Sequence, residues 1–346
     1  MKDKIFLIIG GAGFIGSNFV SKILNEGGKV YLWDNFSRNG NNENIENFKS
    51  HHNLIKIIRA DYLKNEDLMK ELIEKCDCIF HLAAQVAVTT SVANPLLDFE
   101  NNILGTFKLL EKIRVSKNKP ILIYASTNKV YGDLKNLSTI LNEENNQYEY
   151  ANIEGVNEDR NLDFYTPYGC SKGSADQYVL DYSRIYNLRT VVVRQSCIYG
   201  ENQFGVEDQG WIACLAIQAL LGKSINIYGD GKQVRDILHV EDLFEFWKLA
   251  YEKIDISNGK AYNIGGGPFN KMSIINLINK LKREVNDNIS IKFNEWRPGD
   301  QKIYVSDISK AEKDLGWKPK INVDDGCKLL FSWIRKNKNK IKSVLF

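Results

Sequence analysis

The sequence predicts an α/β protein: a doubly wound parallel sheet with helices on both faces, and a smaller, mixed α/β lobe at the C-terminal end. Three observations predict this class. A glycine-rich turn at 10–16 separates the first apolar run from a helical pattern. Short, almost wholly apolar runs then alternate with helical spacing as far as residue 194, which is typical of parallel strands buried on both faces. After about residue 199 this alternation weakens.

The opening stretch has the order strand, glycine turn, helix, strand, acid. The apolar run at 4–9 leads into GGAGFIG at 10–16, helical spacing covers 18–26, and the apolar run at 29–33 ends in Asp34. This is the order of a dinucleotide-binding βαβ unit of the Rossmann type. A glycine turn alone is weak evidence, but here the flanking strand, helix and acid all agree.

Each glycine of this turn has its own role. Gly10 permits the tight bend, Gly13 lets the backbone approach a pyrophosphate, and Gly16 lets the helix pack closely against the strand. The N–H groups and the positive dipole end at the helix start favour the pyrophosphate charge. Asp34 can accept hydrogen bonds from the adenosine ribose and would repel a 2′-phosphate. The stretch therefore predicts NAD, rather than NADP, as the cofactor.

Composition excludes several classes of protein. The formal net charge is only +3 in 346 residues, so no nucleic-acid partner is expected. No apolar run approaches the roughly 20 residues of a membrane helix, so no membrane partner is expected. The first strand starts by residue 5, which leaves no room for a signal peptide. Six cysteines without metal-ligand spacing predict reduced thiols, no metal and a cytoplasmic location.

The remaining elements of the first lobe follow in chain order. A polar, exposed loop is expected at 35–50. Strands are expected at 54–59, 78–82, 121–125 and 190–194, and helices at 65–75, 98–112 and 168–186. The stretch 134–163 breaks this rhythm, and we interpret it as an insertion over a site rather than a core element.

The weaker pattern beyond residue 199 predicts a second lobe. Its helices are expected at 209–221, 242–253, 273–285 and 325–336, and its strands at 224–228, 261–264 and 290–293. The basic tail at 335–342 is expected to be a solvated, fraying end. We therefore divide the chain into an NAD-binding Rossmann domain at 1–198, with the insertion at 134–163, and a mainly substrate-binding lobe at 199–346, from which some segments return to the first domain.

Tyr168 and Lys172 have the spacing that puts two side chains on one face of a helix. An ammonium group beside a phenol stabilises the phenolate, so the lysine is expected to lower the pKa of the tyrosine toward neutrality. Such a tyrosine can take a proton from a substrate hydroxyl while hydride leaves the same carbon for NAD⁺. The spacing is common by chance and gains weight from the dinucleotide-binding pattern before it.

The carboxyl end of the fifth strand carries Ser126 and Thr127. In an open parallel sheet this end faces the ligand crevice, so Thr127 can hydrogen-bond the substrate hydroxyl that Tyr168 deprotonates. Two alternatives stay open. The threonine hydroxyl can cap the backbone locally, or Ser126 can take the role instead.

Together these features resemble the extended short-chain dehydrogenase/reductase family, the NAD-dependent sugar-nucleotide epimerases and dehydratases, over nearly the whole chain. Further shared motifs are HLAA at 81–84, Asn102 with GT at 105–106, STNKVYG at 126–132, and RD with HV between 235 and 240. The resemblance implies a catalytic set, namely Thr127, Tyr168 and Lys172. It also implies a cofactor site composed of Gly10, Gly13, Phe14, Ile15, Gly16, Asp34, Asn35, Asp61, Tyr62, Leu82, Ala83, Ala84, Gln85, Asn102, Ser126, Tyr168 and Lys172. For Asp61, a helix N-cap is an equal alternative.

Two departures narrow the reaction within this family. Its dehydratases carry an Asp-Glu pair after the catalytic threonine, whereas this chain has Asn128-Lys129. Without that acid and base, the resemblance favours epimerisation through transient oxidation over elimination of water. Cys197 stands where many members have an asparagine that contacts the sugar nucleotide, which puts a standard UDP-hexose 4-epimerase site in doubt.

Several stretches resemble most the branch of the family that acts at C2 of a CDP-linked dideoxyhexose. They are QVAVTTS at 85–91, STNKVYGD at 126–133, LDFYTPYGCSKG at 162–173 and GKQVRD at 231–236. The resemblance implies that hydride leaves C2, that a 2-keto sugar turns in the site, and that hydride returns to the other face. The alternatives that stay open are a 4-epimerase of the UDP-hexose type, a reductase, and a non-catalytic NAD-binding sensor.

The same resemblance implies a set of substrate-binding residues, namely Gln85, Thr89, Thr127, Asn128, Cys197, Gln203, Arg235 and Arg297. The two arginines match diphosphate-binding arginines of the family, and guanidinium groups bind phosphate oxygens bidentately. A surface ion pair is the alternative for either. We expect His81 behind the cofactor and His239 in a structural role. Relatives associate through helices like 101–112 and 168–186, so a homodimer or homotetramer is expected.

Overall fold

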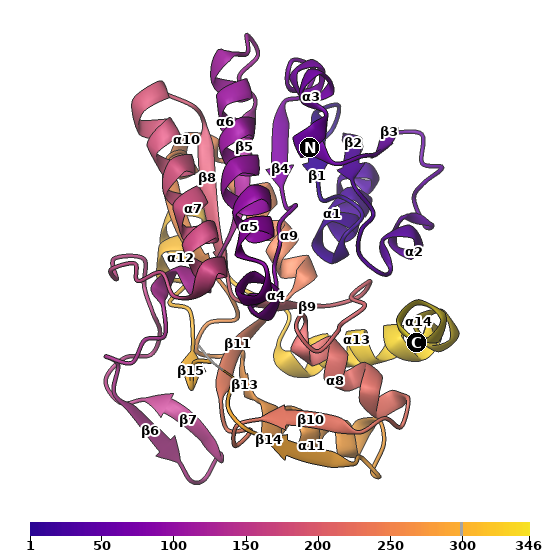
Figure 1. The fold of residues 1–346 in the computed structure, drawn as a ribbon, viewed down its shortest axis with the longest axis vertical. Coiled ribbons are helices and arrows are strands. Elements are labelled where there is room, and N and C mark those ends of the chain that lie inside the picture. The colour runs from indigo at the N-terminus through magenta and orange to yellow at the C-terminus, as the bar shows by residue number, and fades with distance from the viewer. Residues whose placement is uncertain (298–299) are drawn as a thin grey trace.

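The computed structural model describes residues 1–297 and 300–346, and a parallel sheet lies at its centre (Figure 1). The strands of this sheet are β1 (Ile5–Ile9), β2 (Lys29–Asp34), β3 (Leu54–Arg59), β4 (Cys78–His81), β5 (Ile121–Thr127), β8 (Thr190–Gln195) and β12 (Lys260–Ile264). Their order is β12-β8-β5-β4-β1-β2-β3, and all pairs run parallel. The chain crosses over between β3 and β4, so a ligand crevice opens where β1 meets β4. The predicted fold class is confirmed.

Helices cover both faces of this sheet. One face carries α1 (Phe14–Asn25), α9 (Val240–Glu252) and α12 (Ser309–Leu315), and the other carries α3 (Glu66–Ile73), α6 (Gly105–Val115) and α7 (Thr166–Tyr186). On the first face, Trp247 of α9 packs edge-on against Phe19 and Phe80, with ring centroids 5.4 and 4.9 Å apart. On the second face, Leu109 and Val179 are fully buried. This two-sided burial explains why the strands are almost wholly apolar.

The long helix expected at 98–112 is interrupted. The short helix α5 (Pro95–Phe99) runs into a π-helical turn at Glu100–Leu104 before α6 begins. A π turn inserts an extra residue into a helix, and such turns are frequent at functional sites. Only glycine fits at position 105, directly after this turn, because a Cβ there would clash with the hydroxyl of Tyr62.

The second lobe lies below the sheet in Figure 1 and contains two small sheets. Its strands are β9 (Cys197–Tyr199), β10 (Ile225–Tyr228), β11 (Val234–His239), β13 (Lys271–Ser273), β14 (Ile291–Asn294) and β15 (Ile303–Tyr304), and its helices are α8 (Trp211–Leu220), α11 (Ile274–Glu284) and α13 (Val323–Lys336). One sheet pairs β10 with β14, and the other places β11 between β13 and β15 with β9 also on β11. β12 and α9 return to the large sheet, while the exact boundary at residue 198 stays a prediction.

The insertion at 134–163 differs from the expectation that it contributes nothing to a core. It forms a hairpin of β6 (Thr139–Asn142) and β7 (Gln147–Tyr150), which projects at the lower left of Figure 1. Tyr150 and Val156 are buried with Val234 and Tyr304 of the second lobe. These apolar residues are too sparse to give a periodic signal, and only the partner strands reveal them as core.

The basic tail also differs from the expectation of a fraying end. Residues Lys338–Leu345 form α14, and Ile341 is fully buried against the α8, α11 and α13 cluster. Its apolar residues are separated by lysines, so the amphipathic pattern of this helix is not apparent in the basic sequence.

Short helices fill the remaining connections of the described chain. They are α2 (Asn41–Ile45), α4 (Val88–Ala93), α10 (Ile254–Ser257) and 3₁₀ turns at Tyr62–Lys64 and Asn128–Tyr131. Within residues 1–297 and 300–346, no helix has the length and hydropathy needed to cross a membrane.

Candidate active site

The glycine turn forms a cradle at the start of α1. Gly10 has a φ of +87°, and a Cβ there would lie 2.6 Å from the backbone nitrogen of Ala83. A Cβ on Gly16 would clash with the Gly10 carbonyl, whereas one on Gly13 would meet only that carbonyl, at 3.4 Å. Gly13 is the N-cap, and no side chain caps the helix start. The open side at Gly13 and the uncapped N–H groups of Phe14 and Ile15 therefore fit a pyrophosphate.

Asp34 stands at the end of β2, beside this cradle. Its carboxylate accepts hydrogen bonds from the backbone N–H of Phe36 at 2.7 Å and of Ala12 at 3.1 Å, and from the side chain of Asn41 at 2.9 Å. Burial raises the pKa of Asp34, and these hydrogen bonds oppose that shift. Its place beside the cradle lets this carboxylate also accept from a ribose hydroxyl of a bound dinucleotide. Asn35 is exposed, and its side chain accepts from the Ser37 N–H.

Asp61 takes the alternative role that the sequence left open. Its carboxylate caps the 3₁₀ turn by accepting from the N–H of Leu63 at 3.0 Å. Tyr62 is buried, and its hydroxyl donates to the carbonyl of Asn101 at 3.1 Å, next to the π turn. Tyr62 thereby ties the segment after β3 to the π turn.

Asn102, in the π turn, joins the cofactor side to the catalytic helix. Its amide oxygen accepts from the N–H of Gln85 at 2.9 Å, and its amide nitrogen contacts the Gln85 carbonyl, the Asp98 carboxylate and the Ser171 hydroxyl at 3.0 to 3.1 Å. This fixes the segment after β4, in which Leu82, Ala83 and Ala84 are half-buried. The buried Oε1 of Gln85 has no hydrogen-bond partner in the described chain, as expected of a group that waits for a ligand.

The structure brings Thr127, Tyr168 and Lys172 together. All three side chains are buried, and hydrogen bonding by the Thr127 hydroxyl is among the influences that lower the pKa of Tyr168. Lys172 lies one turn along α7, with its ammonium 4.2 Å from the centre of the Tyr124 ring. Ser126 donates instead to Asp176 at 2.7 Å, so its hydroxyl is engaged away from Tyr168. Thr127 also accepts from the N–H of Lys129 at 3.2 Å, so capping and a catalytic contact are compatible.

The pKa of Tyr168 differs from the expectation. Burial raises it to about 12, while the Thr127 hydrogen bond holds it down. Lys172 shifts the other way, because burial lowers its pKa to about 7 against the charges of Asp176 and Asp98. The predicted lowering by Lys172 is wrong for this ligand-free chain, since the ammonium packs on Tyr124 and desolvation dominates both groups.

Two buried carboxylates of this site have no motif in the sequence. Asp98 is 1% exposed, faces Tyr168 and Lys172, and has its pKa raised by burial. Asp176 is fully buried and forms a bidentate ion pair with Arg194, at 2.9 and 3.0 Å. Asp176 lies one turn beyond Lys172 on α7, and that spacing is the only signal that points to it.

His81 and His239 are both buried, and the placing of His81 behind the cofactor stays a prediction. His81 is fully buried at the end of β4 and lies 3.1 Å from the Thr106 hydroxyl, and burial lowers its pKa to about 3. His239 caps α9 through Nδ1 and lies 3.3 Å from Glu201. Neither ring contacts the Thr127, Tyr168 and Lys172 cluster directly.

Both substrate-side arginines pair with carboxylates in the ligand-free chain. Arg235 of β11 donates to Asp300 at 2.7 Å. Arg297 donates to Glu207 at 2.9 Å and stacks over Tyr228. A diphosphate would compete with these carboxylates, so both the phosphate role and the ion-pair role remain compatible with the geometry.

The other expected substrate residues lie on different segments of the chain, and their substrate role stays a prediction. Cys197 of β9 is half-buried near Arg235, and burial raises the pKa of its thiol. Asn128 is buried beside Thr127, and Gln203 is buried with its amide donating to the Ile198 carbonyl at 3.2 Å. Thr89 of α4 is exposed, so it lies at the rim.

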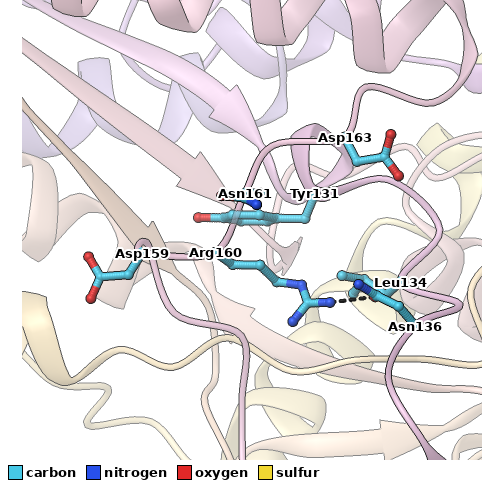
Figure 2. A pocket seen from close by; sticks show the side chains of 7 residues that line it. All are labelled: Tyr131, Leu134, Asn136, Asp159, Arg160, Asn161 and Asp163. Atoms are coloured by element: carbon cyan, nitrogen blue, oxygen red, sulfur yellow. Dashed lines mark hydrogen bonds between the residues drawn. The ribbon is translucent and has the colours of Figure 1, made fainter.

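A separate pocket of about 310 Å³ lies under the insertion, between Tyr131 and Arg160 (Figure 2). Figure 2 shows Arg160 directed toward Asn136, to which it donates a hydrogen bond. Neither Thr127 nor Tyr168 lines this pocket. Among residues 1–297 and 300–346, no cluster of three or more acidic, histidine or cysteine side chains has the arrangement of a metal site.

A family model described as GDP-mannose 4,6 dehydratase matches residues 7–330. The chain belongs to this family. Among its curated relatives, CDP-paratose 2-epimerase from Salmonella typhi is 41% identical over 335 residues, which cover 94% of this chain and 98% of that protein. The predicted family, the extended short-chain dehydrogenases/reductases that act on sugar nucleotides, is thereby confirmed.

Solved structures of the family share the whole fold. UDP-glucuronic acid 4-epimerase from Bacillus cereus, in complex with UDP-glucuronic acid and NAD, superposes with a TM-score of 0.83 at 28% identity, covering 96% of this chain and 99% of that one. A double mutant of dTDP-glucose 4,6-dehydratase from Streptomyces venezuelae with NAD bound gives 0.83 at 26% identity, covering 98% and 99%. The family thus includes epimerases and dehydratases on one scaffold.

Proposed function

We propose that this chain is an NAD-dependent isomerase that interconverts CDP-paratose and CDP-tyvelose by transient oxidation at C2 of the sugar. The observation that carries the proposal is the 41% identity to CDP-paratose 2-epimerase over nearly the full length of both proteins. The arrangement of Thr127, Tyr168 and Lys172 at the carboxyl edge of the sheet supports it, as does Asn128-Lys129 in place of an acid–base pair. The role would belong to O-antigen sugar biosynthesis in the cytoplasm.

The cofactor of the proposal is NAD. The cradle at Gly13 would hold its pyrophosphate, Asp34 its adenosine ribose, and Lys172 and Tyr168 its nicotinamide end. When bound, NAD⁺ supplies a hydride acceptor that returns the same hydride, and a positive charge beside the phenol. Because one hydride and one proton leave and return in each cycle, no net redox partner is needed.

The chain's own residues handle the proton. Tyr168 takes the proton of the C2 hydroxyl as the carbonyl forms and gives it back to the other face of the sugar, with Thr127 holding the same oxygen. The free chain keeps Tyr168 protonated, since burial raises its pKa to about 12. A positive charge beside the phenol would favour the phenolate and so oppose the effect of burial.

The decisive experiment incubates purified protein with CDP-paratose or CDP-tyvelose and resolves the products. Interconversion of the two sugars is the expected result, and protein that releases NAD on denaturation is expected alongside it. An unchanged sugar, with UDP-glucose and UDP-galactose interconverted instead, would overturn the assignment in favour of a 4-epimerase. Substrates deuterated at C2 or C4 identify the oxidised carbon, because mass spectrometry of the trapped keto sugar shows which label is lost.

A non-catalytic NAD-binding sensor is the alternative from another class. Replacing Tyr168 with Phe removes only the phenolic hydroxyl. We expect epimerisation to fall by roughly a hundredfold to ten-thousandfold, the usual range for loss of a general acid–base group, with NAD retained. A sensor would be indifferent to this change, so full retention of function in Tyr168→Phe would favour it.

Assembly is part of the same proposal. A homodimer or homotetramer would cover the apolar side chains that α6 and α7 expose, including Phe107, Tyr178 and Ile185. Tyr178 and Phe107 already contact each other edge-on, with ring centroids 5.4 Å apart. Light scattering of the purified protein measures the assembly state directly.

A further inference from the structure

Lys129 is a charged residue of the crevice that the proposed mechanism does not use. It follows Thr127 by two positions, in the 3₁₀ turn after β5. Its ammonium donates to the side chain of Gln301 at 3.3 Å, and Gln301 is in turn buried and anchored to the carbonyl of Gly132. Lys129 also lines a small hollow with Val88, Tyr165 and Thr166, next to the start of the helix that carries Tyr168.

The charges around Lys129 do not balance. Arg235 and Lys129 both bring a positive charge to this place, and Asp300 is already paired with Arg235 at 2.7 Å. In the described part of the chain, the ammonium of Lys129 forms an ion pair with no carboxylate, and its one hydrogen bond goes to a neutral amide. Burial and the charge of Arg235 lower the pKa of Lys129 to about 8. A partly buried cation without a counter-charge is unfavourable and suits a site that receives an anion.

The chemistry of the proposed substrate provides an anion at this place. In a sugar nucleotide, C1 bears the phosphoryl group, and C2 is the neighbouring carbon, whereas C4 lies across the ring. Oxidation at C2 therefore brings the sugar-linked phosphoryl group close to Thr127 and Tyr168. Lys129 follows Thr127 by only two residues, so its ammonium is a candidate to contact that phosphoryl group. Arg235 of β11, whose charge acts on Lys129, is then left for the rest of the diphosphate.

We propose that Lys129 binds the phosphoryl group bonded to C1 of the sugar and thereby presents C2, rather than C4, to Tyr168. This inference rests on the proposed C2-epimerase function. In the substrate complex, the ammonium donates to a phosphoryl oxygen and Gln301 holds the lysine in place. The neutral amide of Gln301 suits this role, because a carboxylate there would neutralise the lysine and repel the phosphate.

The test compares two ligands that differ by one phosphoryl group. CDP contains the group that is bonded to the sugar in the substrate, and CMP lacks it. Calorimetry on the NAD-loaded full chain is expected to show that Lys129→Met weakens CDP binding roughly ten- to a hundredfold, the effect of losing one charge-assisted hydrogen bond, and leaves CMP binding unchanged. Lys129→Arg is expected to restore most of the CDP affinity. The matched control is Lys135→Met, because Lys135 is an exposed lysine after the same turn.

A further readout separates a direct contact from a structural role. Arg235 of β11, Cys197 of β9, Asp300 and Gln301 are the charged and polar groups that face the ammonium. Since the pKa of Lys129 is about 8, CDP affinity of the wild type is expected to weaken as pH rises above that value. Lys129→Arg keeps its charge and is expected to show no such loss.

The outcomes distinguish this inference from the proposed function. If the wild type prefers UDP or dTDP to CDP, the base assignment fails, and the same comparison is made with that diphosphate and its monophosphate. Equal weakening of diphosphate and monophosphate by Lys129→Met would overturn the phosphoryl contact. Unchanged diphosphate binding, or no affinity of the wild type for any of these diphosphates, would overturn it too.

Discussion

For Tyr168 and Lys172, burial rather than a neighbouring opposite charge causes the largest shift in pKa. Desolvation raises the pKa of Tyr168 to about 12 and lowers that of Lys172 to about 7. Asp98 and Asp176 favour the charged form of Lys172, and Asp98 also disfavours the Tyr168 phenolate. Burial therefore disfavours the charged form of both groups.

Thr127 is the residue whose removal tests this balance. Its hydrogen bond lowers the pKa of Tyr168, so Thr127→Ala raises that pKa further. Because activity needs the phenolate, the acidic limb of the kcat profile is expected to move to higher pH, and kcat near neutrality is expected to fall roughly tenfold to a hundredfold. Steady-state kinetics over a pH series measures both. Thr127→Ser keeps the hydroxyl and should behave nearly as wild type, and an unshifted profile in Thr127→Ala would contradict the role.

Among the elements, α7 is held to the sheet by a buried ion pair. Asp176 receives two hydrogen bonds from Arg194 of β8 and one from Ser126 of β5, so three elements meet at one carboxylate. Arg194 also donates to the Tyr131 hydroxyl at 2.9 Å. This network holds α7 at the carboxyl edge of the strands, where β5 ends at Thr127.

Breaking this pair is expected to destabilise the fold. Asp176→Ala leaves the Arg194 guanidinium, only 5% exposed, without its partner. The expected loss in the free energy of unfolding is about 3–5 kcal/mol, which chemical denaturation measures. The matched control is Glu71→Ala, which breaks the exposed ion pair between Glu71 of α3 and Lys75. This change should leave the unfolding free energy nearly unchanged. Similar losses in both variants would show that the buried network is not special.

Two glycines at the start of α1 allow cofactor binding and folding to be tested separately. Gly13→Ala adds a methyl group that meets only the Gly10 carbonyl, at 3.4 Å, but it fills the side where a pyrophosphate would approach. We expect protein of near-normal stability that purifies with much less NAD, measured by absorbance after denaturation. Gly16→Ala is the contrast, because its Cβ would clash with the Gly10 carbonyl and destabilise the fold itself. Full NAD content in Gly13→Ala would contradict the cradle.

At the scale of the whole molecule, the proposed site lies between two lobes. The chain crosses between these lobes more than once. β12 returns from the second lobe as an edge strand of the large sheet, and α9 packs on one face of that sheet. The hairpin β6–β7 is attached to the second lobe by the Tyr148 hydroxyl, which donates to Asp230 at 2.6 Å. The two lobes are therefore joined through several segments of the chain.

Global stability is expected to depend on pH through His81. The folded chain keeps this histidine neutral, since its pKa is about 3, whereas an unfolded histidine titrates near 6.5. Below about pH 6.5 the unfolded state therefore binds more protons, and the free energy of unfolding is expected to fall by about 1 kcal/mol per pH unit. Denaturation at a series of pH values should show this slope in the wild type and a shallower one in His81→Gln. An identical slope in the two proteins would exclude His81 as the cause.

Much of the fold was predictable because parallel strands buried on both faces are apolar throughout. The strand expected at 190–194 corresponds to β8, in which every residue is buried, and the glycine turn predicted both the first βαβ unit and Asp34 at the end of β2. The π turn at Glu100–Leu104 was not predictable, because Asn102 within it bonds to Gln85 and Ser171, which are distant in the sequence. The core role of Tyr150 and Val156 likewise depends on strands from the other lobe.

By itself, the sequence determined the cofactor unit, the family, and the Tyr168–Lys172 pair, because each is written in local spacing along one element. Only the tertiary structure decided three features. The Ser126 hydroxyl donates to Asp176, Asp98 lies near Lys172, and the charge of Arg235 acts on Lys129. The reason is physical. Burial and charge shift pKa values through neighbours distant in sequence, so the chemistry of a side chain is fixed only when the fold brings those neighbours together.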